Sequence, residues 1–311
     1  MSRYFGIAGV QMSVVAWDEQ ATIAKMKQIV NRVKSGFPWV EMIVFHELCP
    51  SGLVQFDAKP DLESWKRIVQ MIPGDMTNAL CEIANRENIW LVPGSMYERD
   101  GDKVYNTSIA ISPKGEIVAK YRKIFPWYPL ERETTPGNEF CVFDVPNVGR
   151  FGMTICYDMW FPEMVRALVW QGAEVILHPT MTPTSDRDLE LVLSQGNAIM
   201  NQCYFIDING VGPWGGGKSM IIDPDGRVLQ QAGTTETILT EILDLDRVTQ
   251  TREYGTLGLA QTLKQMRDTD IQFPQYQAPY SSGEVFKSLG SLEQFDKINL
   301  KEIHQFHTNK P

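Results

Sequence analysis

The sequence has few of the residues that build zinc sites, disulfide frameworks or membrane spans. Its 311 residues include five cysteines and four histidines, and no Cys-x-x-Cys pair occurs. The odd, irregularly spaced cysteines argue against a disulfide framework and against zinc-ribbon or thioredoxin-type motifs. No apolar run approaches the roughly 20 residues that cross a bilayer. Metal-binding, disulfide-rich and transmembrane classes are therefore not expected.

Positive charge is also scarce. Lysine and arginine number 29 against 38 acidic residues, which gives a net charge of −9. Nucleic-acid binding requires a concentrated basic surface, so neither nucleic acid nor an anionic membrane is expected as a partner. The first residues, MSRYFGIAGVQMS, lack the basic-then-apolar order of a signal peptide. We expect a cytoplasmic protein whose thiols stay reduced.

Apolar runs alternate with segments of helical period over most of the chain. Tyr4 to Gln11 has the composition of a buried strand, and Ile23, Met26, Val30 and Val33 recur on one face of a helix. Further strands are expected at Met42–Phe45, Ile89–Val92, Thr107–Ile111, Ile117–Tyr121, Cys141–Val145, Phe151–Ile155, Val175–Leu177, Tyr204–Ile208, Lys218–Ile222, Arg227–Leu229 and Ile238–Leu243, and further helices at Asn78–Glu87, Pro162–Gln171 and Leu189–Asn201. Helix-separated strands mixed with hairpins predict an α/β layered domain with mixed sheets.

The regular pattern weakens after about residue 248. We interpret residues 1–248 as one domain and residues 249–311 as a C-terminal extension that packs on the core or on another subunit. The extension is polar, with scattered aromatic residues such as Tyr254, Tyr280 and Phe295.

Three segments have a composition suited to chemistry. Glu47 directly follows the expected strand at Met42–Phe45, although a lone glutamate is most often a surface residue. In the second segment, Lys123 leads into the aromatic, proline-rich loop Phe125–Leu130, which is followed by Glu131. Such a cationic strand end is usually solvated, but the density of aromatic residues is typical of a pocket wall.

The third segment places Cys156 between a strand and a helix. Unpaired backbone N–H groups at a helix start can hold an oxyanion and favour a thiolate. A single cysteine is more often a buried structural thiol. A catalytic role for Cys156 is therefore supported only by the three segments together and not by the cysteine alone.

Together the three segments resemble the nitrilase superfamily. The order is Glu after a strand, then Tyr121-Arg122-Lys123, then Cys156-Tyr157-Asp158 with Phe161-Pro162-Glu163. The stretch from Tyr121 to Glu131 is most similar to the aliphatic amidase and formamidase branch. The resemblance covers residues 4 to about 248 and implies an α-β-β-α sandwich, a homo-oligomer built on dimers, and a hydrolase of small amides that needs no metal or organic cofactor.

The resemblance also implies roles for individual residues. Glu47 would be the general base, Cys156 the nucleophile and Lys123 the oxyanion ligand, together with the backbone N–H of Tyr157. Glu131 would orient the substrate or Lys123. We further expect Trp127, Tyr157, Trp160 and Thr182 to bind the substrate. The implied reaction cleaves a primary carboxamide through a thioester, with a nitrilase, an N-carbamoyl amidohydrolase or an acyltransferase as alternatives.

The sequence departs from the family pattern at several positions. His46 stands where proline is usual, and His178-Pro179-Thr180 also differs from the commonest pattern. Members that bind a substrate carboxylate often carry arginine where this chain has Met159 and Trp160. This argues against acid-bearing substrates unless Arg187 supplies the charge, and favours an apolar, aromatic or small acyl group.

Other readings of the sequence are weaker. The run Gly212–Ser219 matches a phosphate-binding loop, but a strand rather than the required helix is expected to follow it. A Cys–His hydrolase would need one of His46, His178, His304 or His307, and nothing in the sequence ties any of them to Cys156. A non-catalytic oligomer would be expected to have lost one of Glu47, Lys123 and Cys156.

Overall fold

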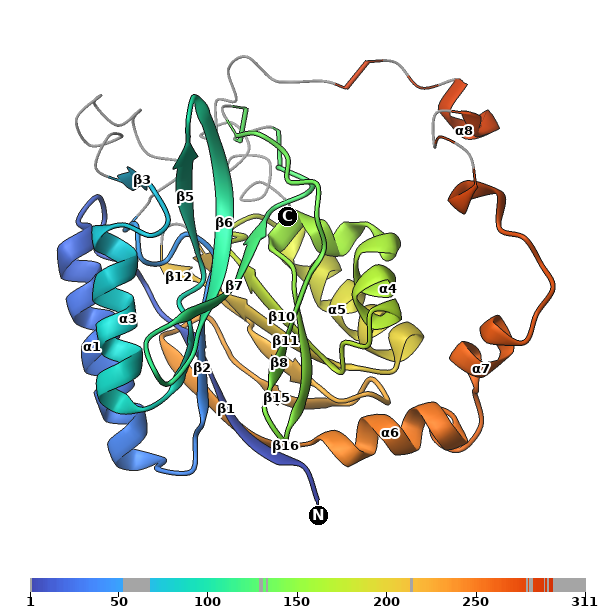
Figure 1. Ribbon diagram of the computed structural model, residues 1–311, viewed down its shortest axis with the longest axis horizontal. Helices are drawn as coiled ribbons and strands as arrows, with labels where there is room; N and C mark the ends of the chain where they lie inside the picture. The colour runs from blue at the N-terminus through green and yellow to red at the C-terminus, as the bar shows by residue number, and fades with distance from the viewer. Residues whose placement is uncertain are drawn as a thin grey trace, which may run out of the picture.

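The protein is a four-layered α-β-β-α sandwich. The computed structural model describes residues 2–52, 68–128, 131–132, 134–212, 215–277, 279, 282–287, 289 and 291–292. Figure 1 shows the sheets face to face in the middle, with helices covering the outer face of each. The α/β sandwich with mixed sheets that the sequence predicts is confirmed. No helix in the described part of the chain combines the length and apolar composition that a membrane span requires.

The first sheet is mixed. Its strands are β1 (Tyr4–Gln11), β2 (Met42–Phe45), β3 (Val69–Gln70), β4 (Trp90–Val92), β5 (Ser95–Asp100), β6 (Lys103–Ile111), β7 (Ile117–Arg122) and β16 (Thr237–Asp244). They are ordered β16-β1-β2-β4-β6-β5-β3, and β7 pairs with β6. Because β1, β2 and β4 are parallel, the carboxyl end of β2 lies at the same sheet edge as the ends of its two neighbours.

The second sheet has a parallel centre and antiparallel edges. Its strands are β8 (Cys141–Val145), β9 (Gly149–Met153), β10 (Val175–Thr180), β11 (Tyr204–Asn209), β14 (Met220–Ile222) and β15 (Val228–Gln231). They are ordered β15-β14-β11-β10-β9-β8. The short strands β12 (Val211–Gly212) and β13 (Gly215–Gly216) form a separate pair.

Side-chain alternation along the strands divides the core into three layers. In β1, Phe5 and Ile7 face the second sheet, whereas Ala8 and Val10 face the outer helices. In β11, Ile206 faces the first sheet and Phe205 the opposite helices. Both sheets are thus covered on both faces, which explains why their strands read as nearly continuous apolar runs.

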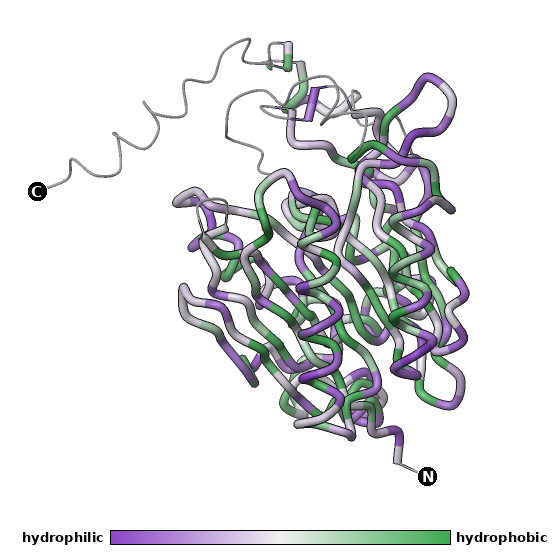
Figure 2. Tube along the Cα trace, turned by 90° about the vertical axis from the view of Figure 1, so that its left-hand side faces the viewer, coloured by the Kyte–Doolittle hydropathy of each residue, from purple (hydrophilic) through white to green (hydrophobic). Residues whose placement is uncertain are grey.

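Each outer helix has an amphipathic sequence and buries its apolar face against a sheet. Helix α1 (Glu19–Gly36) begins after Asp18, whose carboxylate accepts the N–H of Ala21, and it packs with α3 (Asp75–Glu87) on the first sheet. On the second sheet lie α4 (Pro162–Trp170), which begins with proline, and α5 (Arg187–Asn201). Figure 2 shows hydrophilic and hydrophobic residues succeeding one another along the outer helices.

Most expected elements are present, with small shifts. Strand β9 ends at Met153, two residues before its predicted end at Ile155, and β10 continues to Thr180, past its predicted end at Leu177. Strand β5 was missed because its second half, Glu98 to Asp100, is charged. The glycine-rich run before Ser219 is followed by strand β14, as expected, and not by a helix.

The chain continues past residue 248 without a break in structure. Helix α6 (Leu245–Tyr254) crosses that position, and Arg252 donates hydrogen bonds to the carbonyls of Ala173 and Gln202. Helix α7 (Thr262–Arg267), the 3₁₀ turn η2 (Pro274–Tyr276) and α8 (Glu284–Lys287) then run along one side of the molecule, away from its body (Figure 1). Leu259 is 83% exposed. Tyr280 and Phe295 lie outside the described residues.

A tight backbone contact fixes the end of β2. Gly94 has a φ of +88°, and a β-carbon placed on it would lie 1.8 Å from the carbonyl oxygen of His46. Gly101 has a φ of +59°, but a β-carbon there would meet no described atom within 4 Å. Comparing substitutions at the two glycines therefore separates the cost of a positive φ from the cost of a steric overlap.

We predict that Gly94→Ala is more destabilising than Gly101→Ala. The control substitution adds only the strain of positive φ, about 1 kcal/mol. Gly94→Ala adds an overlap that moves the backbone and costs about 1–3 kcal/mol more. Urea unfolding of both variants measures the difference, and equal losses of stability would show that the contact at His46 is unimportant.

Candidate active site

All eight residues that the sequence analysis expects at the site line one pocket. These are Glu47, Lys123, Trp127, Glu131, Cys156, Tyr157, Trp160 and Thr182. The pocket is narrow: the centre of a water-sized group can occupy only about 20 Å³ within it. Among the described residues, Met181, Pro183, Thr184, Asp186 and Glu190 also line it, and they were not predicted from the sequence.

The centre of the site is a buried lysine between two buried carboxylates. Lys123 Nζ lies 3.0 Å from Glu47 Oε1 and 2.6 Å from Glu131 Oε2, and each of the three side chains is almost fully buried. Glu47 follows β2 and Lys123 follows β7, so the two strand ends supply the pair. The general expectation that such a glutamate and such a lysine lie on the surface is wrong here.

Asn106 joins the two carboxylates and was missed in the sequence. It lies in β6, is 1% exposed, and its Nδ2 donates to Glu47 Oε1 and Glu131 Oε1, each at 2.8 Å. The backbone also holds Glu131, since its Oε2 accepts the N–H of Trp127 at 2.7 Å. Asparagine in an apolar strand carries little signal by itself, so only the fold reveals its place between the two carboxylates.

The charges in this cluster shift one another. Burial raises the pKa of Glu47, and the nearby Glu131 carboxylate raises it further, against the effect of Lys123. Burial lowers the pKa of Lys123, but Glu131 and then Glu47 outweigh burial and raise it well above its usual range. Lys123 is therefore a permanent cation, and Glu47 is a better proton acceptor than an exposed carboxylate.

Cys156 lies at the turn between the second sheet and its helices. It begins the 3₁₀ helix η1 (Cys156–Trp160) with a φ of +47°, an uncommon conformation for a residue other than glycine. Burial raises the pKa of its thiol well above the usual range, and Glu47 raises it further, whereas Lys123 lowers it. The resting group is therefore a thiol, and it lines the same pocket as the Glu47 carboxylate.

Asp158 holds the cysteine turn against the lysine loop. Its carboxylate accepts the Tyr121 hydroxyl at 2.6 Å, the Ile155 N–H at 2.9 Å and the Phe125 N–H at 3.0 Å. Burial raises the pKa of Asp158 to about 6, although these hydrogen bonds and Lys123 lower it. One buried side chain thus links the segments that carry Lys123 and Cys156.

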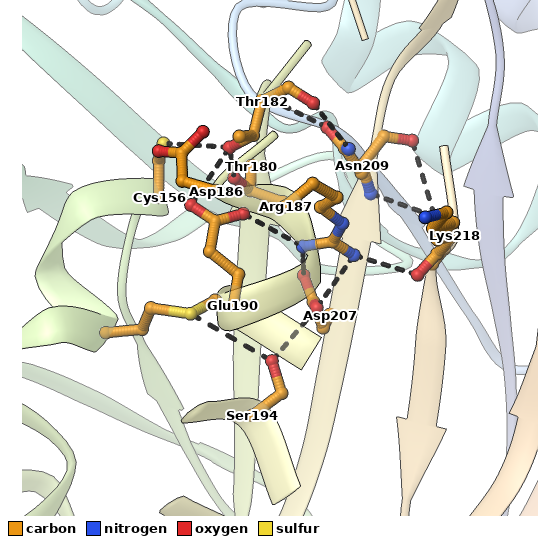
Figure 3. Close-up of polar contacts among 12 residues, drawn as sticks. Cys156, Thr180, Thr182, Asp186, Arg187, Glu190, Ser194, Asp207, Asn209 and Lys218 are labelled. Atoms are coloured by element: carbon orange, nitrogen blue, oxygen red, sulfur yellow. Dashed lines mark hydrogen bonds and ion pairs between the residues drawn. The ribbon is translucent and has the colours of Figure 1, made fainter. Parts of the chain in front are cut away.

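A second polar network lines the pocket beside Cys156 (Figure 3). Thr182 Oγ1 lies 3.8 Å from Cys156 Sγ and 3.0 Å from Glu190 Oε1. Arg187 lies 3.1 Å from Glu190 Oε2 and 2.9 Å from Asp207 Oδ2, and all three charged side chains are buried. Arg187 is thus already paired with two carboxylates.

The histidines considered as partners of Cys156 make structural contacts instead. His46 Nδ1 contacts the Glu47 carbonyl oxygen, His178 Nδ1 contacts Thr154 Oγ1, and burial lowers the pKa of both rings. Neither histidine is among the described lining of the pocket, so the described chain offers no Cys–His pair. His304 and His307 lie outside the described residues. Within the described part of the chain, no group of three potential ligands could hold a metal ion.

Comparisons with known proteins agree with this arrangement. The family model described as carbon-nitrogen hydrolase matches residues 6–253. Omega-amidase NIT2 of Homo sapiens is 33% identical over 202 residues, which cover 59% of this chain and 72% of that protein. A formamidase of Bacillus cereus is 30% identical over 239 residues, which cover 73% of this chain and 70% of that protein.

Solved structures show the same fold. Nit3 of Saccharomyces cerevisiae, a member of branch 10 of the nitrilase superfamily, is 25% identical with a TM-score of 0.72, covering 81% of this chain and 94% of that one. A carbon-nitrogen hydrolase from Helicobacter pylori is 21% identical with a TM-score of 0.74, covering 89% and 99%, and so supports the fold alone. The chain belongs to the carbon-nitrogen hydrolase family of the nitrilase superfamily and is an enzyme that hydrolyses carbon–nitrogen bonds other than peptide bonds.

Proposed function

We propose that this enzyme hydrolyses a primary carboxamide to a carboxylic acid and ammonia through a thioester on Cys156. The observation that carries the proposal is Lys123 held between two buried carboxylates in the same pocket as Cys156. An amide carbonyl is a poor electrophile, so its hydrolysis needs an activated nucleophile and a site for the developing negative charge.

Glu47 would activate the nucleophile. Its carboxylate lines the same pocket as the Cys156 thiol, and burial raises the pKa of Glu47 toward that of the sulfur it deprotonates. As Sγ attacks the carbonyl carbon, the thiol proton moves to Glu47 and the carbon–oxygen π electrons move to oxygen. Lys123 Nζ and the backbone N–H of Tyr157 would stabilise that oxyanion.

The same carboxyl group would then serve both later steps. Protonated Glu47 gives its proton to the amide nitrogen, the carbon–nitrogen bond breaks, and ammonia leaves a thioester on Cys156. Glu47 next removes a proton from water as the water attacks the thioester, which releases the acid and restores the thiol. Glu131 and Asn106 keep Lys123 and Glu47 in position during both half-reactions.

We infer that the acyl group is small. The centre of a water-sized group can occupy only about 20 Å³ of the pocket, and Trp127, Tyr157 and Trp160 form its aromatic walls. Arg187 is ion-paired with Glu190 and Asp207, so its charge is already neutralised and does not bind a substrate carboxylate. An acid-bearing ω-amide therefore fits this pocket less well than a short uncharged amide.

We predict ammonia release from short aliphatic amides and none from the Cys156→Ala variant. The panel should contain formamide, acetamide, larger aliphatic and aromatic amides, an ω-amide acid, nitriles and carbamoyl compounds. Turnover is expected to fall as the acyl group lengthens and to be lowest for the acid. Cys203→Ala is the matched control, because Cys203 is buried in the helix-facing core and should be dispensable for turnover.

Each other pattern of activity identifies a different enzyme. Release only from nitriles or only from carbamoyl compounds would identify a nitrilase or an N-carbamoyl amidohydrolase with the same residues. An acyl-amine conjugate without free acid would identify an acyltransferase. Ammonia release that survives in Cys156→Ala would contradict the assignment of the nucleophile.

We also propose that the enzyme is a homo-oligomer. Apolar side chains are exposed on the outer helices, with Trp170 77% and Val192 68% exposed, and others follow on the segment after α6. Clusters of this kind are usual at subunit contacts. We expect the C-terminal extension to pack on a neighbouring copy as well.

Light scattering after size exclusion should therefore give a multiple of the 35.3 kDa chain mass. Val192→Asp should lower the assembly mass, whereas the control Val118→Asp, at an exposed valine of β7, should not. A monomeric wild type would contradict the proposal.

A further inference from the structure

Thr182 is held more rigidly than a loop residue usually is. The Asn209 side chain makes two hydrogen bonds to the Thr182 backbone. Its Oδ1 accepts the Thr182 N–H at 2.9 Å, and its Nδ2 donates to the Thr182 carbonyl oxygen at 3.1 Å. Nδ2 also donates to Gly217 O at 2.9 Å. Thr182 is 5% exposed and its side chain lines the pocket beside Cys156. Its hydroxyl oxygen therefore has a fixed position at the reacting centre.

The environment of Glu190 fixes the direction in which that hydroxyl donates. Arg187 Nη1 donates to Glu190 Oε2 at 3.1 Å, and Arg187 also donates to the carbonyl oxygens of Gly217 and Lys218. This buried cation favours the ionised carboxylate, although burial raises the pKa of Glu190 to about 7. An ionised carboxylate only accepts hydrogen bonds, so the Thr182 hydroxyl donates to Glu190 Oε1, 3.0 Å away.

The consequence is a pocket wall of defined polarity. Because its one hydrogen points to Glu190, Thr182 Oγ1 has only lone pairs left for its other neighbours. One neighbour is Thr180 Oγ1 at 3.1 Å, and another is Cys156 Sγ at 3.8 Å. A group that binds at the sulfur and meets this wall must therefore donate a hydrogen bond.

We propose that Thr182, oriented by Glu190, accepts an N–H of the scissile carboxamide and makes the site selective for amides over esters and nitriles of the same acid. The inference rests on the proposed amide hydrolysis and names the residues that distinguish amides from other acyl donors. Thr182 is the specificity-determining residue, and Glu190 is a positioning residue that acts through it. A carboxamide nitrogen has two N–H donors, whereas an ester oxygen and a nitrile nitrogen have none.

The interaction also suits the transition state. When Glu47 protonates the leaving nitrogen, the N–H groups gain positive character and bind an acceptor more strongly. An acceptor that gains strength as the bond breaks contributes to rate as well as to binding. Thr182 would thus assist the departure of ammonia.

The test compares an amide and an ester of the same short acid at pH 8, above the pKa of Glu190. Both substrates form the same thioester, so differences in kcat/KM arise before that intermediate. Thr182→Val should lower kcat/KM for the amide about 10- to 100-fold and for the ester less than about 3-fold. Glu190→Gln should shift the ratio in the same direction, because its amide NH₂ donates to Thr182 and turns the hydroxyl toward the pocket.

Two variants serve as controls. Thr182→Ser keeps the hydroxyl and should keep the wild-type ratio of amide to ester. Ser194→Ala removes a hydroxyl that contacts Asp207 at 3.0 Å in the same network but does not line the pocket, and its ratio should also match wild type.

Equal losses for amide and ester in both Thr182→Val and Glu190→Gln would overturn the inference and leave Thr182 as mere support for Cys156. A wild type active on the ester but on no amide would instead contradict the proposed function, and this inference with it.

Discussion

The site depends on one buried cation, Lys123, which lies between Glu47 and Glu131. Removing charges from water is costly, and the mutual attraction of the three groups repays that cost only where the geometry is good and the remaining hydrogen-bonding positions are filled. Asn106 and the N–H of Trp127 fill positions on the two carboxylates. The fold therefore has to be rigid where these groups meet, because a displaced member would leave a buried charge without a partner.

The sandwich supplies this rigidity from two sheets. Glu47 and Lys123 follow strands β2 and β7 of the first sheet, and Cys156 follows β9 of the second. The packed layer between the sheets fixes their separation, and Asp158 adds direct hydrogen bonds from the cysteine turn to Tyr121 and to the loop after Lys123. Next to the sulfur, Asn209 and Glu190 orient Thr182 from β11 and α5. Two buried networks thus meet at one thiol.

Much of the fold could be predicted from the sequence because burial leaves a direct pattern. Strands β1, β2 and β8 have the bounds that their apolar runs indicate. Strand β5 could not be predicted, because charged residues fill its second half. Glu47, Lys123 and Cys156 were predicted as site residues from their order and flanking residues. Asn106 and Glu190 were not, since their importance comes from neighbours distant in sequence, such as Glu131 for Asn106, and the sequence alone does not show those contacts.

Turnover of the best amide by a folded Lys123→Met variant tests the central claim most directly. Folding is checked by urea unfolding at pH 5 and pH 8. The raised pKa of Glu47 makes protonation favour the folded state, so stability declines as pH rises from the unfolded-state value of about 4.3 through the folded-state pKa. Loss of Lys123 raises that pKa further, so the variant should lose more stability than wild type between the two pH values. We predict a folded protein at pH 5 whose turnover is at least about 10²- to 10³-fold below wild type at the same pH. Turnover near the wild-type rate would contradict the account.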